Sequence, residues 1–144
     1  MKILTLANRL QLVGDKLGEN ITLEQWLFIA IILKNGNPSP TLSDVAAIFS
    51  CSRQNVKKMA AILEKQGFVS FNRGEKDSRI VRVQLSSKCS TYFKNREDPE
   101  NEFMSDLFTG FDEDLTEGLF KGILQIADIL ERLEGKYTNI RASE

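Results

Sequence analysis

Apolar residues recur at spacings of three and four near both ends of the chain. Residues 3–17 carry one such stripe, and another follows Asp112 or Thr116, either of which can open the last helix. This period predicts amphipathic α-helices that each present one apolar face. Residues 23–34, preceded by Thr22 as a capping residue, are apolar nearly all round, which is typical of a helix buried among others.

Two short helices joined by a tight turn are expected in the middle of the chain. The first begins at Thr41 or Ser43 and ends at Phe49, and the second covers residues 53–66. Residues 50–52 form the turn, and the serine that ends it can cap the second helix. The inner side of that helix is expected to carry its apolar residues, Val56, Met59, Ala60, Ile62 and Leu63.

The hydrophobic period changes to two after this pair of helices. Residues 68–71 and 80–85 alternate between apolar and polar side chains and predict two strands. The polar residues 72–79, which include a glycine, are expected to form the tip of the hairpin. The sequence therefore predicts a mainly α-helical fold with one small antiparallel β-sheet.

Helical patterns return after the second strand, where Ser86 can cap the next helix. Pro99 interrupts the pattern, so we expect a kink or break there and then a helix to Phe108. Alternatively, Asp98 caps a new helix in which Pro99 is the first residue. The tail over residues 136–144 is polar and is expected to be frayed.

Two helices, a turn and a hairpin in this order form a winged helix-turn-helix, in which the second helix enters the major groove of DNA. We expect this DNA-binding region to cover residues 21–85. The helices of residues 1–20 and 86–144 are expected to form a dimerisation region.

The distribution of charge agrees with a nucleic-acid partner, although the net charge is only −1. Residues 50–96 contain eleven Lys and Arg against three acids, a net charge of +8, whereas the rest contains eight against seventeen, a net charge of −9. A basic surface on an acidic body is the electrostatic footprint of a DNA-binding protein. The alternative is a chance clustering of solvated charges.

The absence of histidine narrows the possible chemistry. It excludes Ser-His and Cys-His nucleophile pairs and metal sites built on histidine. No other catalytic constellation is present, so we expect no enzymatic activity, no cofactor and no metal. The acids near Pro99 are expected to form a solvated stretch.

Two cysteines, Cys51 and Cys89, do not form a disulfide framework. Either thiol could sense oxidants, and the alternative for Cys51 is a small buried apolar side chain. No apolar run approaches the roughly 20 residues of a membrane span, and no signal peptide is recognised. We therefore expect a cytoplasmic protein without a membrane partner.

The candidate DNA-contacting residues lie in two groups. In the major groove, Arg pairs with guanine and Asn or Gln with adenine, whereas serine hydroxyls, lysines and helix N-terminal amides hold phosphates. An arginine on a hairpin tip can enter the minor groove. The helix group comprises Ser50, Ser52, Arg53, Gln54, Asn55, Lys57 and Lys58, and the wing group comprises Arg73, Lys76, Asp77 and Arg79. A plain solvated helix face and a hairpin ion pair between Asp77 and Arg79 are the alternatives.

These features occur in an order that resembles the multiple-antibiotic-resistance (MarR-type) family of transcriptional regulators. The wing motif D-x-R is present as Asp77-Ser78-Arg79. The resemblance covers nearly the whole chain. The other matching runs are residues 41–46, 52–56, 62–69, 81–86 and 107–111.

The resemblance implies a homodimer in which the N- and C-terminal helices interlock and present two winged heads. It also implies that Asp77 orients the wing, that Arg79 reaches the minor groove, and that a small molecule or an oxidant modulates binding. Pro99 and Cys89 depart from the family pattern. Repression at a pseudo-palindromic double-stranded DNA operator is the expected function, and a winged-helix protein-interaction module without DNA binding is the alternative.

Overall fold

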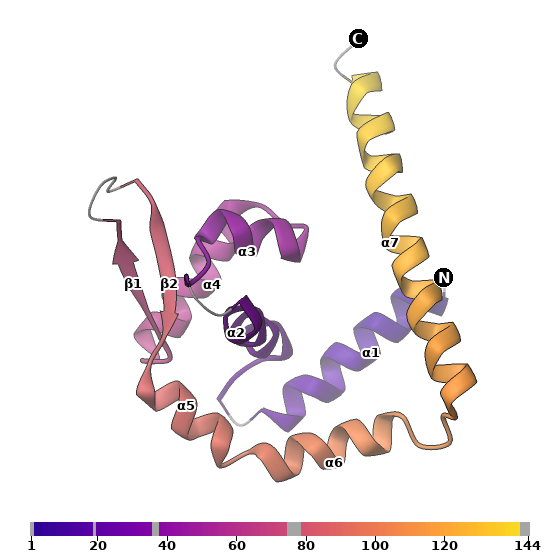
Figure 1. The fold of residues 1–144 in the computed structure, drawn as a ribbon, viewed down its shortest axis with the longest axis horizontal. Coiled ribbons are helices and arrows are strands. Elements are labelled where there is room, and N and C mark those ends of the chain that lie inside the picture. The colour runs from indigo at the N-terminus through magenta and orange to yellow at the C-terminus, as the bar shows by residue number, and fades with distance from the viewer. Residues whose placement is uncertain (1, 19, 36–37, 75–78, 142–144) are drawn as a thin grey trace. The chain divides into compact units, whose positions relative to one another are not determined.

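The computed structural model describes residues 2–18, 20–35, 38–74 and 79–141 (Figure 1). The chain divides into two compact units, Met1–Asn101 and Glu102–Glu144, and the division falls within one helix. The elements are α1 (Lys2–Leu17), α2 (Leu23–Asn35), α3 (Leu42–Phe49), α4 (Arg53–Lys65), β1 (Val69–Arg73), β2 (Val81–Leu85), α5 (Ser87–Lys94), α6 (Glu97–Leu107) and α7 (Glu113–Arg141). The predicted mainly helical fold with a small antiparallel sheet is confirmed.

Side-chain caps begin most of these helices. Thr41 begins α3, because its hydroxyl accepts from the Asp44 N–H and the Asp44 carboxylate accepts from the Thr41 N–H. Asp112, rather than Thr116, begins α7, since its carboxylate accepts from the Leu115 N–H at 2.8 Å. Each cap satisfies an amide that has no partner within its helix. The capping residues expected before α2, α4 and α5 are also observed, at Thr22, Ser52 and Ser86.

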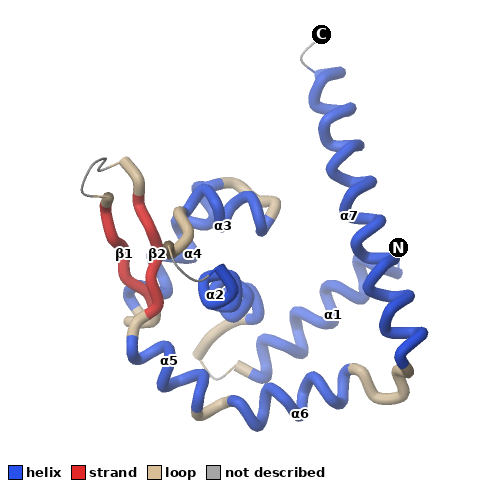
Figure 2. Tube along the Cα trace, viewed as in Figure 1, coloured by secondary structure: helices blue, strands red, loops and turns tan. Residues whose placement is uncertain are grey.

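The strands β1 and β2 form a hairpin (Figure 2), and they pair in antiparallel register with Phe71 opposite Val83. The chain just before α3 extends this ladder. Thr41 forms a β-bridge with Arg82, and the Val83 N–H donates to the Pro40 carbonyl at 3.0 Å. The start of α3 is therefore fixed to the base of the hairpin.

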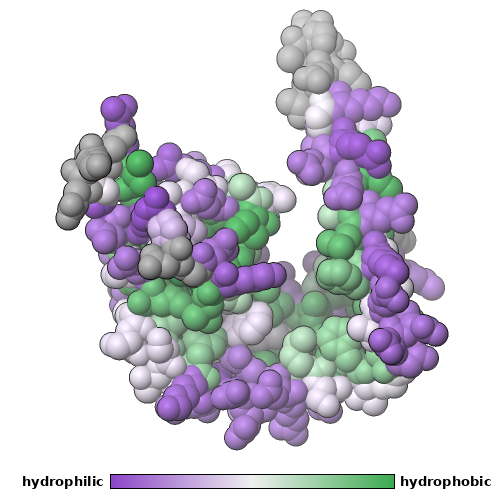
Figure 3. All heavy atoms as spheres, viewed as in Figure 1, coloured by the Kyte–Doolittle hydropathy of each residue, from purple (hydrophilic) through white to green (hydrophobic). Residues whose placement is uncertain are grey.

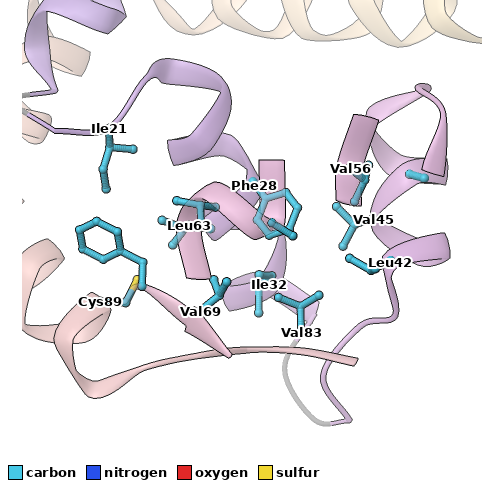
Figure 4. Close-up of a cluster of buried hydrophobic side chains, with 14 residues drawn as sticks. Ile21, Phe28, Ile32, Leu42, Val45, Val56, Leu63, Val69, Val83 and Cys89 are labelled. Carbon is cyan, nitrogen blue, oxygen red and sulfur yellow. The ribbon is translucent and has the colours of Figure 1, made fainter. Parts of the chain in front are cut away.

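The hydrophobic core lies where α2, α3, α4 and the hairpin meet (Figure 4). Phe28, Val45, Val56, Leu63 and Val83 are fully buried there. Burial of such a side chain stabilises a fold by about 1.5–3 kcal/mol. No polar or charged side chain is buried among the described residues. The core therefore holds the pair α3–α4 against the hairpin through apolar contacts.

Ile62 does not lie on the inner side of α4, contrary to the prediction. The buried residues of that helix are Val56, Ala60 and Leu63, and Ile62 is 50% exposed. At about 100° per residue, a position two residues from Ala60 lies on the opposite side of the helix.

The break before α6 occurs earlier than predicted. The structure places it at Asn95, the C-cap of α5, and α6 begins at Glu97. Pro99 therefore lies within the first turn of α6, and Asp98 is not the cap. Proline is tolerated in the first turn because amides there have no partner within the helix.

The tail over residues 136–144 was predicted to be frayed, yet α7 extends to Arg141, and residues 142–144 lie outside the described residues. Residues 136–141 contain neither glycine nor proline, so nothing in the sequence stops the helix there. None of the described helices combines the length and the apolar character needed to cross a membrane.

Gly18 allows the chain to turn sharply after α1. A Cβ atom at this position would lie 1.9 Å from the carbonyl oxygen of Ile21. Gly18→Ala should therefore lower the free energy of unfolding by about 2–3 kcal/mol, measured by urea denaturation. Gly135→Ala is the control, since no heavy atom lies within 4 Å of its added Cβ. A Gly18→Ala variant as stable as the parent would contradict this packing.

Candidate nucleic-acid interface

The turn between α3 and α4 is shaped by its two serines. Ser50 adopts a left-handed conformation with φ 49°, which ends α3 and reverses the chain. The Cys51 N–H closes the turn by donating to the Ala46 carbonyl at 3.1 Å. Ser52 then begins α4, because its hydroxyl oxygen accepts from the Asn55 N–H at 3.2 Å. This geometry fixes the direction in which α4 leaves the turn.

The predicted contact residues of α4 lie together on its exposed surface. The stripe of Val56, Ala60 and Leu63 is buried in the core. The opposite side of the first two turns is exposed and carries polar and basic side chains. These exposed residues are Arg53, Gln54, Asn55, Lys57 and Lys58. The helix thus presents hydrogen-bond donors and acceptors of the kind that read base edges.

The wing group is only partly described. Arg73, the last residue of β1, and Arg79, close to the start of β2, are both exposed. The Gly74 N–H donates to the Ile80 carbonyl at 3.0 Å, so the hairpin stays paired up to this level. Lys76 and Asp77 lie outside the described residues, and the roles proposed for them stay predictions.

Arg82 has a structural role that the sequence did not indicate. Its guanidinium donates to the Ser39 carbonyl at 2.6 Å and so ties β2 to the segment before α3. Asp44 lies nearby, and hydrogen bonds from Thr41 hold the pKa of its carboxyl below the ordinary value, with a smaller effect from the charge of Arg82. In the sequence, Arg82 is one more basic residue in a basic segment, and no pattern marks it as different.

The two cysteines differ in environment. Cys89 is 1% exposed, and desolvation raises the pKa of its thiol to about 11. Because the thiolate is the form that reacts with oxidants, this burial disfavours Cys89 as a sensor. Cys51 is half-buried, and it packs against the core cluster as a small apolar side chain would.

The arrangement of a capped helix pair, an open basic helix face and a hairpin defines the winged helix-turn-helix class of DNA-binding fold. The sequence model of the MarR family matches residues 21–81, which span α2 through the start of β2. A comparison with curated protein sequences finds no match.

Solved structures share this fold over most of the chain. A MarR/EmrR family transcriptional regulator from Acinetobacter sp. ADP1 is 18% identical with a TM-score of 0.79, covering 91% of this chain and 93% of its own. The S. aureus MepR–DNA complex is 15% identical with a TM-score of 0.77, covering 89% and 93%. PcaV from Streptomyces coelicolor, solved with its natural ligand, is 18% identical with a TM-score of 0.71, covering 85% and 89%.

The contrast between the thiols predicts their reactivity. In the folded protein near pH 8, iodoacetamide should modify Cys51 at least about tenfold faster than Cys89, because Cys89 is buried and protonated. Mass spectrometry of timed samples measures both rates. Cys51→Ser is the control and should leave one thiol that reacts only after unfolding. Equal labelling of both cysteines in the folded state would contradict the burial of Cys89.

Proposed function

We propose that this protein is a transcription regulator that binds double-stranded DNA in a sequence-specific manner. The observation that carries the proposal is the exposed start of α4, where Arg53, Gln54 and Asn55 follow the cap at Ser52. The MepR structure is a complex with DNA, and its shared fold supports the same role for this chain. We further propose repression, because a dimer bound at a promoter blocks access to it.

Base reading is assigned to the first turn of α4. Arg53 can pair with guanine through two hydrogen bonds, and Gln54 or Asn55 can pair with adenine in the same way. Lys57 lies one turn further along and can reach a base or a phosphate. Lys58 is assigned to phosphate, as are the backbone amides that begin the helix.

The remaining contacts are assigned to phosphate and to the minor groove. Ser50 and Ser52 can donate their hydroxyl protons to phosphates at the edge of the major groove. Arg73 and Arg79 extend the basic surface onto the wing, where an arginine can enter a narrow, electronegative minor groove. Lys76 and Asp77 are assigned to the same tip from the sequence alone.

A homodimer is proposed because two long helices, α1 and α7, each carry exposed apolar side chains. On α7, one set of exposed apolar residues recurs at alternating spacings of four and three, and Figure 3 shows exposed apolar residues along this helix. They are Leu119, Ile123, Ile126, Leu130, Leu133 and Tyr137, each between 39% and 59% exposed. This is the heptad pattern by which one helix packs against another. A second copy of the chain supplies such helices.

The same pattern is found on α1, where Ile3, Leu6, Leu10 and Val13 are exposed at spacings of three and four. Exposed apolar surface of this extent is typical of an oligomer interface. We therefore assign residues 1–20 and 86–144 to dimerisation and residues 21–85 to DNA binding. A two-fold dimer would read a pseudo-palindromic operator.

Modulation by a small-molecule effector is the last part of the proposal. PcaV was solved with its natural ligand, which supports an effector for a chain that shares its fold. A cytoplasmic location, where an operator and such an effector would be available, is proposed with it. No cofactor is invoked.

Substitutions at Asn55 and Lys58 should separate base reading from phosphate binding. Asn55→Ala should reduce the difference in binding free energy between operator and random DNA by about 1–3 kcal/mol, because it loses a paired contact to a base. Lys58→Ala should weaken binding to all DNA sequences alike. It should also lower the slope of the logarithm of the binding constant against the logarithm of the salt concentration by up to about one unit. Competition binding to operator and random duplexes at several salt concentrations measures both effects. The operator is first obtained by sequencing DNA fragments that the protein selects.

The control in this comparison is Lys34→Ala, at an exposed lysine in the last turn of α2. Full discrimination by Asn55→Ala would show that the base-reading assignment is wrong. A wild-type protein that binds no duplex at moderate salt would favour the alternative, a winged-helix protein-interaction module.

The dimer is tested on the heptad face of α7. Ile126→Glu should weaken dimerisation at least about 100-fold, because each protomer would bury an unpaired carboxylate in the interface. Gln125→Glu adds the same charge at a neighbouring position outside the heptad pattern and should leave the dimer intact. Light scattering across a dilution series measures the mass of each variant. A wild-type protein that is a monomer at micromolar concentration would overturn the proposed dimer.

A further inference from the structure

Two helices end close to α5, and a cationic side chain contacts the last carbonyl of each. The ammonium of Lys88 donates to the carbonyl of Gln66, the C-cap of α4, at 2.7 Å. The guanidinium of Arg96 donates to the carbonyl of Leu17, the last residue of α1. Positive charge at a helix C-terminus is stabilising, because the terminal carbonyls carry partial negative charge. One short segment of the chain therefore contacts the C-terminal ends of α1 and of α4, which is the proposed recognition helix.

Two aromatic rings connect these cations. The Lys88 ammonium lies 5.3 Å from the centroid of the Phe68 ring, which is buried. Phe68 packs edge-on against Tyr92, with 5.2 Å between ring centroids. The Arg96 guanidinium lies 5.5 Å from the centroid of Tyr92. Cation–π and edge-to-face contacts at these distances are favourable, so the four side chains form one continuous row.

We propose that Lys88, Phe68, Tyr92 and Arg96, here called the α5 link, position the recognition helix relative to α1 and thereby set the affinity for the operator. The proposal rests on the proposed DNA binding. These are positioning residues, because the link contacts the C-terminal end of α4 whereas the proposed base contacts lie at its N-terminal end. They affect the affinity for DNA through the orientation of α4.

The physical reason lies in the spacing of the half-sites. Two recognition helices of a dimer must meet grooves about 34 Å apart, and α1 belongs to the proposed dimerisation region. A small rotation of the DNA-binding region, residues 21–85, against α1 would misalign α4 with its groove without removing any DNA-contacting side chain. The link opposes that rotation, since it joins α1 to the recognition helix through packed rings and two charged hydrogen bonds.

The test uses Arg96→Gln, Lys88→Gln and the double variant in the full chain. Each single variant should weaken operator binding about three- to tenfold, which lies within the roughly two- to thirtyfold range of residues that couple two sites. The double variant should weaken it by less than the product of the two effects, because either change breaks the same row. Lys94→Gln is the matched control, since it removes one positive charge from an exposed position of α5. The salt slope of all variants should equal that of the control, because no phosphate contact is lost.

Hydrogen exchange provides a measurement that does not depend on DNA. Arg96→Gln lies at the α1 end of the link, yet it should speed amide exchange at residues 64–68, at the recognition-helix end, relative to Lys94→Gln. If the wild type binds no DNA but this exchange still increases, the proposed function fails and the link stands. Arg96→Lys keeps the charge and one donor but loses the planar stack, so its affinity should lie between those of wild type and Arg96→Gln.

Three results would overturn the link. The first is unchanged exchange at residues 64–68 in Arg96→Gln. The second is a double variant whose effect equals the product of the single effects, which would make Lys88 and Arg96 independent local contacts. The third is operator affinity of Arg96→Gln within twofold of the Lys94→Gln control.

Discussion

The burial of one stripe of α4 is the constraint on which the rest of the site depends. Val56, Ala60 and Leu63 are buried against α3 and the hairpin, and each position of a helix is turned by about 100° from the next. Once this stripe is buried, the rotation of the helix is fixed, and the residues after Ser52 must face outward. Turning the helix over would bury the Lys57 charge without a partner, which costs several kcal/mol. The open polar face is thus a consequence of the apolar core.

The two units meet the demand for burial in different ways. The winged head closes a core of its own, with residues such as Phe28 and Val45 fully buried. In the second unit the heptad face of α7 is exposed instead, and in the first unit the stripe of α1 is exposed as well. A dimer would cover these faces and would also give the two heads a fixed separation. On this view the same apolar surface that stabilises the protein sets the spacing at which it reads DNA.

Local chemistry explains why much of the fold could be predicted from the sequence. The caps at Thr22, Ser52 and Ser86 and the change of period at the hairpin act within a few residues, and all are observed. The errors concern choices that depend on distant neighbours. Pro99 marks a break in a sequence pattern, yet the chain accommodates it inside the first turn of α6. The exposure of Ile62 likewise follows from which face of α4 meets the core.

Some of the basic residues in the segment of residues 50–96 make structural contacts within the chain. Residues 50–96 contain eleven Lys and Arg, and among those that the structure describes, Arg82 donates to the Ser39 carbonyl, Lys88 to Gln66 and Arg96 to Leu17. No pattern in the sequence separates them from the residues proposed to contact DNA, because their partners lie 22 to 79 residues away. The net charge of this segment therefore overstates its phosphate contacts. The basic side chains that tie the fold together and those that are proposed to hold DNA occur in the same segment, and the sequence alone does not tell them apart.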